Sequence, residues 1–428
     1  MAACSLKFAI VLISLALISV ECSKFVTYDG YKVYELKQKS TRDVEYLRSL
    51  GEQSQSNGLD FWKLSKLVND DAVVLVEPAN QKIFEQNLIE NSIEFNEIIS
   101  NVQNTINEER IDQRAIQFSK FFKTRSILNA YYRFDEINKY LDELSQKYSK
   151  NVQVEEVGKS FEGRTIKTIR ISNGEQKADK PVIFLDAGIH AREWAAPATA
   201  LYTIQQLVEN STVNSDILDN VDFIVLPVVN PDGYEYTHEK ERLWRKTRSS
   251  GERCDGVDGN RNFDFHWAEV GSSHRECDEI YHGKTAFSEP ETQIVREILE
   301  KYENRCKFYL TLHTYGNYLL YPWGYTSDLP ETVADLDEVS QAGAAAIRKA
   351  TGTKYQVGTS TNVLYAAAGG SDNYAFAVNK VPISITMELP GGGTSGFNPP
   401  PSKIEHIVTE SWTGIRAMVL KVIEKYVK

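Results

Sequence analysis

Four apolar runs in the second part of the chain alternate with segments of helical pattern, and this alternation begins near Ser126. Such alternation is typical of an α/β sheet with buried parallel strands. Ligands of open α/β sheets bind beyond the carboxyl ends of the strands. We therefore expect the polar residues that follow the runs to meet at one edge of the sheet. The runs are 182–185, 223–229, 308–312 and 383–387, and the residues that follow them are His190, Asn230, His313 and Glu388.

The pattern of the first part predicts a small α+β unit. Residues 31–36 alternate between apolar and polar positions as a strand does, and 71–78 indicate a buried strand. Segments 40–49 and 81–90 have a helical pattern. Residues 101–122 are polar and helix-prone, and the basic residues around their end suit a linker that a trypsin-like protease could cut. An ordinary interdomain helix explains the same composition equally well.

The first residues are predicted to be a signal peptide, 1–22. Lys7 precedes the mostly apolar stretch 8–20, which is too short to span a bilayer and ends before compact residues suited to cleavage. We expect a secreted protein. The chain has 428 residues, 42% of them hydrophobic, which suffices for one large core and a smaller companion domain. A net charge of −11 argues against nucleic acid or an anionic membrane as the main partner.

Three cysteines remain after removal of the signal peptide, and an oxidising compartment favours one bridge among them. We predict a bridge between Cys254 and Cys277, because both lie in a loop stretch rich in Gly, Ser and Asp. Cys306, at the edge of an apolar run, is predicted to be a buried free thiol. Asn210 begins a glycosylation sequon, which a secreted protein can use.

His190 and Glu193 stand three residues apart, and His313 closes another apolar run. Two imidazoles and one carboxylate are the protein ligands of hydrolytic zinc sites, whose fourth position stays open for water. Taken alone, a histidine followed by a glutamate three residues later is more simply explained as a loop histidine whose hydrogen bonds are satisfied. The position of both histidines at one sheet edge instead favours a metal site, and the chemistry of such a site is cleavage of a carbonyl bond.

Glu388 ends the run 383–387, where a buried charge is costly without a partner or a function. It is either a strand-end salt bridge or a general base beside a metal-activated water. The basic segment 242–248 is either a solvated face or the source of an arginine that stabilises an oxyanion. Arg261 adds a guanidinium suited to gripping a carboxylate in two contacts. A zinc hydrolase with arginines aimed at a carboxylate would cleave the terminal peptide bond of a chain.

Together these segments resemble the zinc metallocarboxypeptidases of the carboxypeptidase A/B type, which are made as secreted proenzymes. The likeness spans nearly all of residues 126–428 in the family's order. It implies an α/β catalytic domain there, with a central mixed, largely parallel sheet flanked by helices. It also implies a small α+β open-sandwich activation domain over 23–125, and we expect a monomer. The matching motifs are 188–194, 230–234, 242–248, 260–262, 313–315, Tyr365 and 388–389.

The resemblance assigns the machinery of hydrolysis. By it, His190, Glu193 and His313 hold one zinc ion. Glu388 is the general base and later returns the proton to the leaving amine. Arg245 polarises the scissile carbonyl and stabilises the oxyanion.

The resemblance also assigns substrate contacts. Asn260, Arg261 and a mobile Tyr365 would bind the C-terminal carboxylate of the substrate, and Arg192 and Tyr315 would line the next subsite. The same likeness supports the predicted disulfide and implies a cis peptide bond before Tyr315. One departure is the segment 390–393, Pro-Gly-Gly-Gly, where many relatives carry an arginine–aspartate pair, and this leaves the relative preference for lysine and arginine open.

Asp372 falls where the pocket floor is apolar in A-type enzymes and aspartate in B-type ones. A carboxylate at the bottom of a closed pocket would pair with lysine or arginine and disfavour apolar residues. The alternative is that Asp372 caps a helix starting near Asn373. We expect a carboxypeptidase zymogen with B-like preference, cleaved near Arg125. An A-type enzyme and a non-catalytic binding protein on the same fold are the rival hypotheses.

Overall fold

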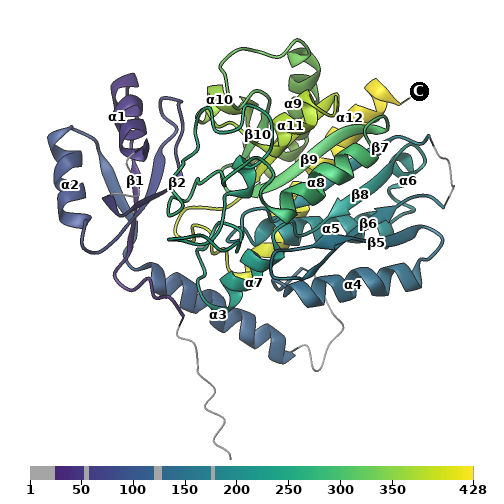
Figure 1. Cartoon of the computed structure of the whole chain (residues 1–428), viewed down its shortest axis with the longest axis horizontal. Helices are drawn as coiled ribbons and strands as arrows, with labels where there is room; N and C mark the ends of the chain where they lie inside the picture. Colours follow the sequence, from purple (N-terminus) through teal and green to yellow (C-terminus); the bar gives the residue numbers. More distant parts are fainter. Residues whose placement is uncertain (1–24, 53–56, 120–127, 175–178, 428) are drawn as a thin grey trace, which may run out of the picture.

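The computed structural model describes residues 25–52, 57–119, 128–174 and 179–427. It has two domains joined by one long helix, α3 (Val102–Ser119), which lies along the lower side of both in Figure 1. The predicted signal peptide and the basic end of the linker, including Arg125, lie outside the described residues. Within the described ranges, no helix combines the length and apolarity that crossing a bilayer requires.

The N-terminal domain is a four-stranded antiparallel sheet in the order β2-β3-β1-β4. Alternation along β3 explains its packing, because Val74 and Val76 join the core under the two helices while Val73 and Leu75 face the other way. That other face packs against the larger domain, where it meets Phe397. The elements are β1 (Lys32–Leu36), α1 (Thr41–Glu52), β2 (Leu59–Lys63), β3 (Ala72–Val76), α2 (Gln81–Glu90) and β4 (Phe95–Ile99).

The larger domain is built on an eight-stranded mixed sheet in the order β11-β10-β12-β9-β7-β8-β6-β5. Its central strands β12, β9, β7 and β8 are parallel, and antiparallel pairing begins at β10 on one side and β6 on the other. This confirms the predicted mixed, largely parallel sheet. The strands are β5 (Val152–Lys159), β6 (Thr165–Ile171), β7 (Val182–Ala187), β8 (Asp222–Leu226), β9 (Cys306–Thr314), β10 (Tyr318–Tyr321), β11 (Gln356–Thr359) and β12 (Ile383–Leu389).

Helices cover both faces of this sheet. On one face α4, α5, α9 and α12 bury apolar side chains in the largest core, and on the other α8 and α11 do the same. The helices of this domain are α4 (Phe134–Lys147), α5 (Ala195–Val208), α6 (Ser215–Leu218), α7 (Pro231–Glu239), α8 (Pro290–Lys301), α9 (Val333–Thr351), α10 (Ser360–Val363), α11 (Ser371–Ala377) and α12 (Ile404–Tyr426), with short 3-10 turns η2 (Gly259–Arg261) and η3 (Pro401–Lys403).

The apolar runs predict the central strands correctly, but β7, β9 and β12 extend further than their runs, whereas β8 ends at Leu226, before the end of the run 223–229. His313 and Glu388 are the penultimate residues of β9 and β12, whereas the sequence places them just beyond the strand ends. Strands β2 and β4 were not predicted, because their buried and exposed positions do not alternate. The helix-prone segment after β4 forms α3, as an interdomain helix.

Candidate active site

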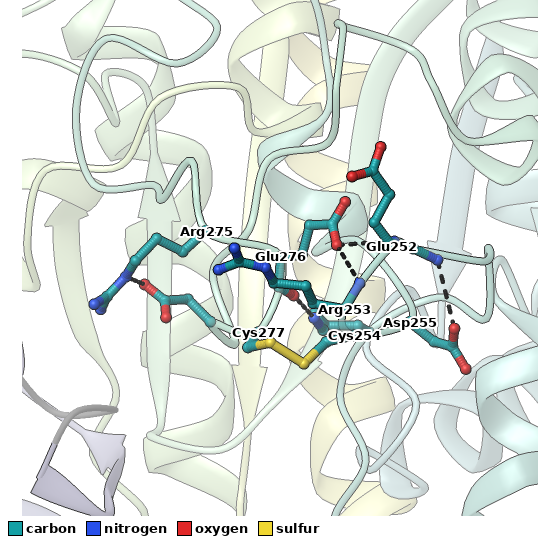
Figure 2. Close-up of a disulfide and its surroundings, with 10 residues drawn as sticks. Glu252, Arg253, Cys254, Asp255, Arg275, Glu276 and Cys277 are labelled. Atoms are coloured by element: carbon teal, nitrogen blue, oxygen red, sulfur yellow. Dashed lines mark hydrogen bonds and ion pairs between the residues drawn. A yellow bond between two sulfur atoms is a disulfide. The ribbon is translucent and has the colours of Figure 1, made fainter.

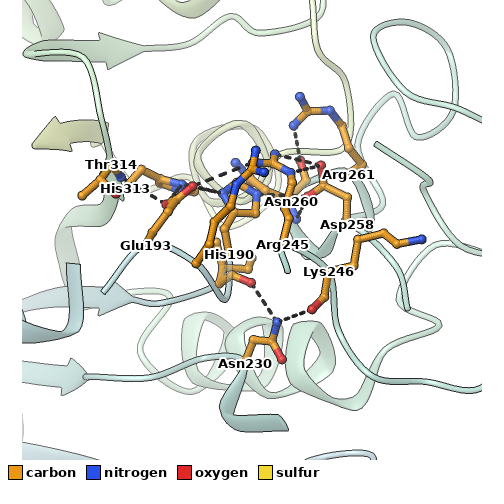
Figure 3. A network of polar contacts seen from close by, with 12 residues as sticks. His190, Glu193, Asn230, Arg245, Lys246, Asp258, Asn260, Arg261, His313 and Thr314 are labelled. Carbon is orange, nitrogen blue, oxygen red and sulfur yellow. Dashed lines mark hydrogen bonds and ion pairs between the residues drawn. The ribbon is translucent and has the colours of Figure 1, made fainter. Parts of the chain in front are cut away.

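The three predicted metal ligands converge at the carboxyl edge of the sheet (Figure 3). The Nδ1 atoms of His190 and His313 are 3.1 Å apart. The carboxylate of Glu193 lies 2.8 Å from Nδ1 of His190 and 3.2 Å from Nδ1 of His313. All three side chains are buried. Among the described residues, this is the only set of three histidine, cysteine or acidic side chains close enough to share a metal ion.

Two neighbouring parallel strands bring these ligands together. His190 and Glu193 lie in the turn between β7 and α5, and His313 lies near the end of β9, which pairs with β7. Gly188 opens the turn with a φ of +69°, and a Cβ there would come within 3.0 Å of a proline ring. The N–H of Thr314 donates to Oε2 of Glu193 over 3.1 Å, which orients the carboxylate.

This donor set fits zinc. Donor atoms about 2 Å from a tetrahedral zinc ion are about 3.3 Å from one another, close to the spacing observed. Nε2 of His190 lies 3.1 Å from Oδ1 of Asp258, and a metal-ligating histidine usually gives its other ring nitrogen to such a partner. Burial lowers the pKa of His190, and Arg245 adds to this effect. The neutral imidazole therefore keeps a lone pair for the metal.

Asp258 is a site residue that the sequence did not reveal. Its Oδ2 accepts a hydrogen bond of 2.9 Å from Nη2 of Arg245, so one buried carboxylate orients both His190 and this arginine. Burial lowers the pKa of Arg245, but Asp258, Glu193 and Tyr365 outweigh that effect and raise it. The guanidinium stays charged 3.8 Å from Glu193, where it can stabilise an oxyanion.

Asn230 lies at the same edge, but its side chain has a structural task. It caps α7, and its Nδ2 donates to the carbonyl oxygens of Ile189 at 3.2 Å and Lys246 at 3.0 Å. These bonds tie the loop that carries His190 to the loop that carries Arg245 (Figure 3). Asn230, which follows β8, therefore aligns two loops. The metal ligands and Glu388 come from the ends of β7, β9 and β12.

Glu388 lies beside the metal ligands. It is in register with His313 on the adjacent parallel strand, and the charges of His313, Glu193 and Arg245 all act on it. Burial raises the pKa of Glu388 to about 7 against the opposing effect of His313. A carboxyl group in this range exchanges protons near neutral pH, as a general base must.

Asn260 and Arg261 lie in η2, and Asn260 is bonded to the first residue of α11. Oδ1 of Asn260 accepts a hydrogen bond of 3.0 Å from the N–H of Ser371. Arg261 donates from Nε to the carbonyl of Gly271 and from Nη1 to that of Asn260, each over 2.8 Å. Tyr365 precedes α11 on the same connection and acts electrostatically on Arg245. The three residues expected to contact a carboxylate thus occupy one region.

Asp372 lies in the first turn of α11 and is only 4% exposed. Gly370, and not Asp372, is the N-cap of this helix, although the backbone N–H groups of Asp372 and Asn373 in its first turn interact with the Asp372 carboxylate. Oδ1 of Asp372 accepts a hydrogen bond of 2.9 Å from Nδ2 of Asn373. Burial raises the pKa of Asp372, and none of the described residues forms an ion pair with it.

Arg192 and Tyr315 lie on the other side of the metal ligands, where the N-terminal domain meets them. Nη1 of Arg192 donates to Oδ2 of Asp60 in β2 over 2.6 Å. The ring of Tyr315 packs edge-on against Phe397, with centroids 5.0 Å apart. The Thr314–Tyr315 peptide bond is cis, as the resemblance implies. In this structure the N-terminal domain occupies the space next to these two residues.

The basic segment 242–248 is not a solvated face. Arg242 is buried against Glu109 of α3, with Nε 2.6 Å from Oε2 and Nη2 2.9 Å from Oε1. Its guanidinium also lies over the ring of Trp194, 3.6 Å from the centroid. This arginine anchors α3 to the larger domain, while Arg245 faces the metal ligands.

The predicted disulfide between Cys254 and Cys277 is present, with Cα atoms 5.0 Å apart (Figure 2). Next to it, the carboxylate of Glu276 accepts two backbone N–H bonds of 2.9 Å each from the facing loop. Cys306 is a buried free cysteine, as predicted. Asn210 is exposed in the turn after α5, which leaves the sequon accessible.

Residues 137–414 match the zinc carboxypeptidase family, and residues 34–109 match the carboxypeptidase activation peptide. The chain belongs to the zinc carboxypeptidase family. The second match runs from β1 through the N-terminal domain into α3, so this domain is an activation domain. This zinc carboxypeptidase is therefore the zymogen of an exopeptidase. The metal implied by the family agrees with the donor set of His190, Glu193 and His313.

Relatives of this zinc carboxypeptidase carry both type names. Carboxypeptidase B of Astacus astacus is 46% identical over 302 residues, which cover 70% of this chain and 97% of that protein. Zinc carboxypeptidase A 1 of Drosophila melanogaster is 37% identical over 404 residues, which cover 93% of each chain. The crystal structure of carboxypeptidase A from Helicoverpa armigera matches with a TM-score of 0.85 and 33% identity, over 93% of this chain and 99% of that one.

Proposed function

We propose that this zinc carboxypeptidase is a secreted B-type enzyme that removes C-terminal lysine or arginine after a trypsin-like protease cuts its activation segment. The chain would consist of a signal peptide (1–22), an activation domain (23–125) and a catalytic domain (126–428). The B-type preference rests on Asp372, a buried carboxylate that no described cation neutralises. A substrate lysine or arginine would supply the missing charge.

Hydrolysis would use five side chains around the metal. His190, Glu193 and His313 would hold zinc, which when bound supplies Lewis acidity to a carbonyl and lowers the pKa of water. Glu388 takes a proton from the attacking water and later gives it to the amine of the leaving residue. Arg245 donates hydrogen bonds to the carbonyl oxygen as that oxygen becomes negative. Asp258 keeps Arg245 charged and oriented during this change.

The terminal residue of the substrate would bind between η2 and α11. Arg261, Asn260 and Tyr365 would hold its carboxylate, and the backbone bonds of Arg261 fix the guanidinium before the substrate arrives. The side chain would extend to Asp372. A lysine or arginine there forms an ion pair out of water, whereas an apolar side chain leaves a buried carboxylate unpaired, which disfavours its binding.

We also propose how the enzyme is kept inactive and in which compartment it works. The Asp60–Arg192 ion pair supports a zymogen in which the activation domain covers the cleft. Cleavage near Arg125 would end that contact by releasing the domain. The Cys254–Cys277 disulfide supports an oxidising compartment, and the exposed Asn210 supports a glycan there.

The test compares initial rates on peptides that differ only in the final residue, Arg, Lys, Phe or Leu, before and after limited trypsin treatment. We expect Arg and Lys to be released fastest, and much faster after treatment than before it. Chelator-treated protein should regain activity with one zinc ion per chain. Faster release of Phe or Leu would establish the A-type alternative, and zinc binding without any hydrolysis would establish a non-catalytic protein.

A further inference from the structure

Two histidines outside the active site face each other in the loop 273–282, which closes on itself. The N–H of Ser273 donates to the carbonyl of Ile280 over 2.9 Å, and the N–H of His282 donates to the carbonyl of Ser273 over 3.1 Å. These bonds bring His274 beside His282. The two rings are perpendicular, with centroids 4.4 Å apart, and Nε2 of His282 lies 2.9 Å from Nδ1 of His274.

The ring of His282 is fixed in place before any ligand arrives. This residue is only 3% exposed, and its Nδ1 lies 2.8 Å from the carbonyl oxygen of Gly283. Because a carbonyl oxygen only accepts, Nδ1 carries the hydrogen of the ring and Nε2 keeps a lone pair. Trp267 packs edge-on against the ring, with centroids 4.6 Å apart. Burial lowers the pKa of His282, so the imidazole is neutral at pH 7.

His274 differs from its partner because it is exposed. In the metal-free loop, Nδ1 of His274 donates a hydrogen bond to the lone pair on Nε2 of His282. A neutral imidazole can carry its hydrogen on the other ring nitrogen instead, and both facing nitrogens then offer lone pairs. This change moves a hydrogen from Nδ1 to Nε2 of one exposed ring through water and releases no net proton.

The geometry of the pair is that of two ligands of one metal ion. Nitrogen atoms about 2 Å from a tetrahedral zinc ion lie about 3.3 Å apart, and the facing nitrogens of His190 and His313 in the active site are 3.1 Å apart. A metal-ligating histidine usually donates its other N–H to a carbonyl or carboxylate, as His282 does. The nearby charge of Arg275 is compensated, since its Nε donates to Oδ2 of Asp278 over 2.9 Å.

We propose that His274 and His282 bind a second divalent transition metal ion such as zinc, at a site separate from the active centre. Imidazole nitrogens suit zinc and copper in particular. No third histidine, cysteine or acidic residue of the described ranges lies close enough to join the pair. Water would therefore fill the other positions on the exposed side of His274, and the ion would be held less tightly than one with three protein ligands.

Such an ion would clip together the two ends of a loop that supports the substrate-binding segment. The carbonyl of Gly271 accepts a hydrogen bond of 2.8 Å from Nε of Arg261, and the carbonyl of His282 accepts one of 2.9 Å from Nδ2 of Asn262. The disulfide at Cys277 already ties the middle of the loop to a facing segment (Figure 2). The metal would fix the ends, and its role would be structural.

The experiment counts the zinc ions that the zymogen binds after chelator treatment, by equilibrium dialysis and elemental analysis. His274→Ala removes one ligand at an exposed position, where the fold has little to lose. His406→Ala is the matched control, because His406 is an exposed histidine of α12 with 63% of its side chain accessible. Thermal unfolding with and without zinc, measured on the same three proteins, reports whether the second ion stabilises the fold.

We expect two zinc ions per chain in the unmodified protein and in His406→Ala, and one in His274→Ala. The second ion should raise Tm by about 2 °C, and this rise should be absent in His274→Ala. Equal zinc counts in the unmodified protein and in His274→Ala would overturn the inference. A count that falls from one to zero would support the site at His274 and contradict the metal site at His190. The two sites are thus tested separately, and no peptide substrate is needed.

Discussion

The two halves of the proposed cleft differ in which domain completes them. In the terminal half, Asn260 and Arg261 are bonded to Ser371 and Gly271, all within the catalytic domain. In the upstream half, Arg192 is bonded to Asp60 of the activation domain. The terminal half is therefore already assembled in the zymogen, while the upstream half is occupied. We infer that latency would be a matter of blocked access, and that the terminal half would need no rebuilding once the activation domain leaves.

The two contacts that hold the activation segment also differ. Arg242 and Glu109 are both fully buried, whereas Asp60 keeps 23% of its side chain exposed. When one partner of a buried ion pair is lost, the other charge is left uncompensated, whereas water partly compensates the charge in a pair that is partly exposed. We infer that Glu109 governs how firmly the segment is attached and Asp60 how completely the upstream half is closed.

The largest effect should come from the border between the halves, at Glu388. Glu388→Gln is expected to lower kcat about 100-fold to 10,000-fold on every peptide, because the proton acceptor is lost. In the unmodified enzyme, burial raises the pKa of Glu388 to about 7, so activity should rise as pH increases toward that value and deprotonates the carboxyl. A bound cation would move this limb to lower pH by favouring the carboxylate.

Steady-state rates between pH 5 and pH 9 measure this limb, and unchanged zinc content in the variant serves as the control. A variant that retains its activity, or loses it on only one class of peptide, would show that Glu388 is not the shared base.

The second largest effect is expected at the buried ion pair that attaches α3 to the catalytic domain. Glu109→Ala should lower the free energy of unfolding of the zymogen by about 3–5 kcal/mol, since Arg242 is left buried without its partner. Thermal or denaturant unfolding of the full chain measures this. Glu108→Ala is the matched control, an exposed glutamate one position earlier on α3. Equal effects of the two substitutions would mean that the buried pair does not anchor the helix.

In the terminal half, Asp372→Ala should lower the ratio of kcat/KM for Arg over Phe peptides about 100-fold, because the carboxylate that pairs with the basic side chain is gone. The Phe peptide is the internal control and should be cut as well as before or better. A parallel loss on both peptides would place Asp372 in support of α11 and not in the choice of substrate.

The smallest effect is expected for closure of the upstream half. Asp60→Asn should raise the activity of the uncut zymogen on small substrates by up to about tenfold, since the charge on Arg192 loses its partner. Asp71→Asn is the control, because Asp71 pairs with Lys37 inside the activation domain and has a similar exposure of 26%. Trypsin-treated forms of all three proteins should have equal activity. A rise in the Asp71 variant as well would indicate general loosening of the domain.

Much of the catalytic sheet and its metal ligands could be predicted from sequence for a local reason. Buried parallel strands leave continuous apolar runs, and the residues after them must share one edge. His190, Glu193 and His313 therefore stand out once the runs are seen. The family resemblance singled out Arg245 within its basic segment and added Asp372, and no periodicity reveals either position.

The site features that could not be predicted from sequence depend on contacts between distant segments. Asp258 bonds both His190 and Arg245, and nothing in its local pattern marks it as the link between them. Glu109 lies in a polar helix where it looks like any solvated glutamate, yet it is buried by a partner 133 positions away. Pairings of this kind follow from how the two domains dock.

The disulfide closes a stretch of 23 positions that includes Asp258, Asn260, Arg261 and Gly271. Reduction of the disulfide would allow this stretch more conformations in the unfolded chain. In the folded chain, the stretch would open more easily. The residues set loose would be those that orient one metal ligand and grip the end of the substrate. A thiol-rich environment would thus loosen the residues that bind the end of the substrate, so the reducing interior of the cell would act as a second safeguard against misplaced peptidase activity.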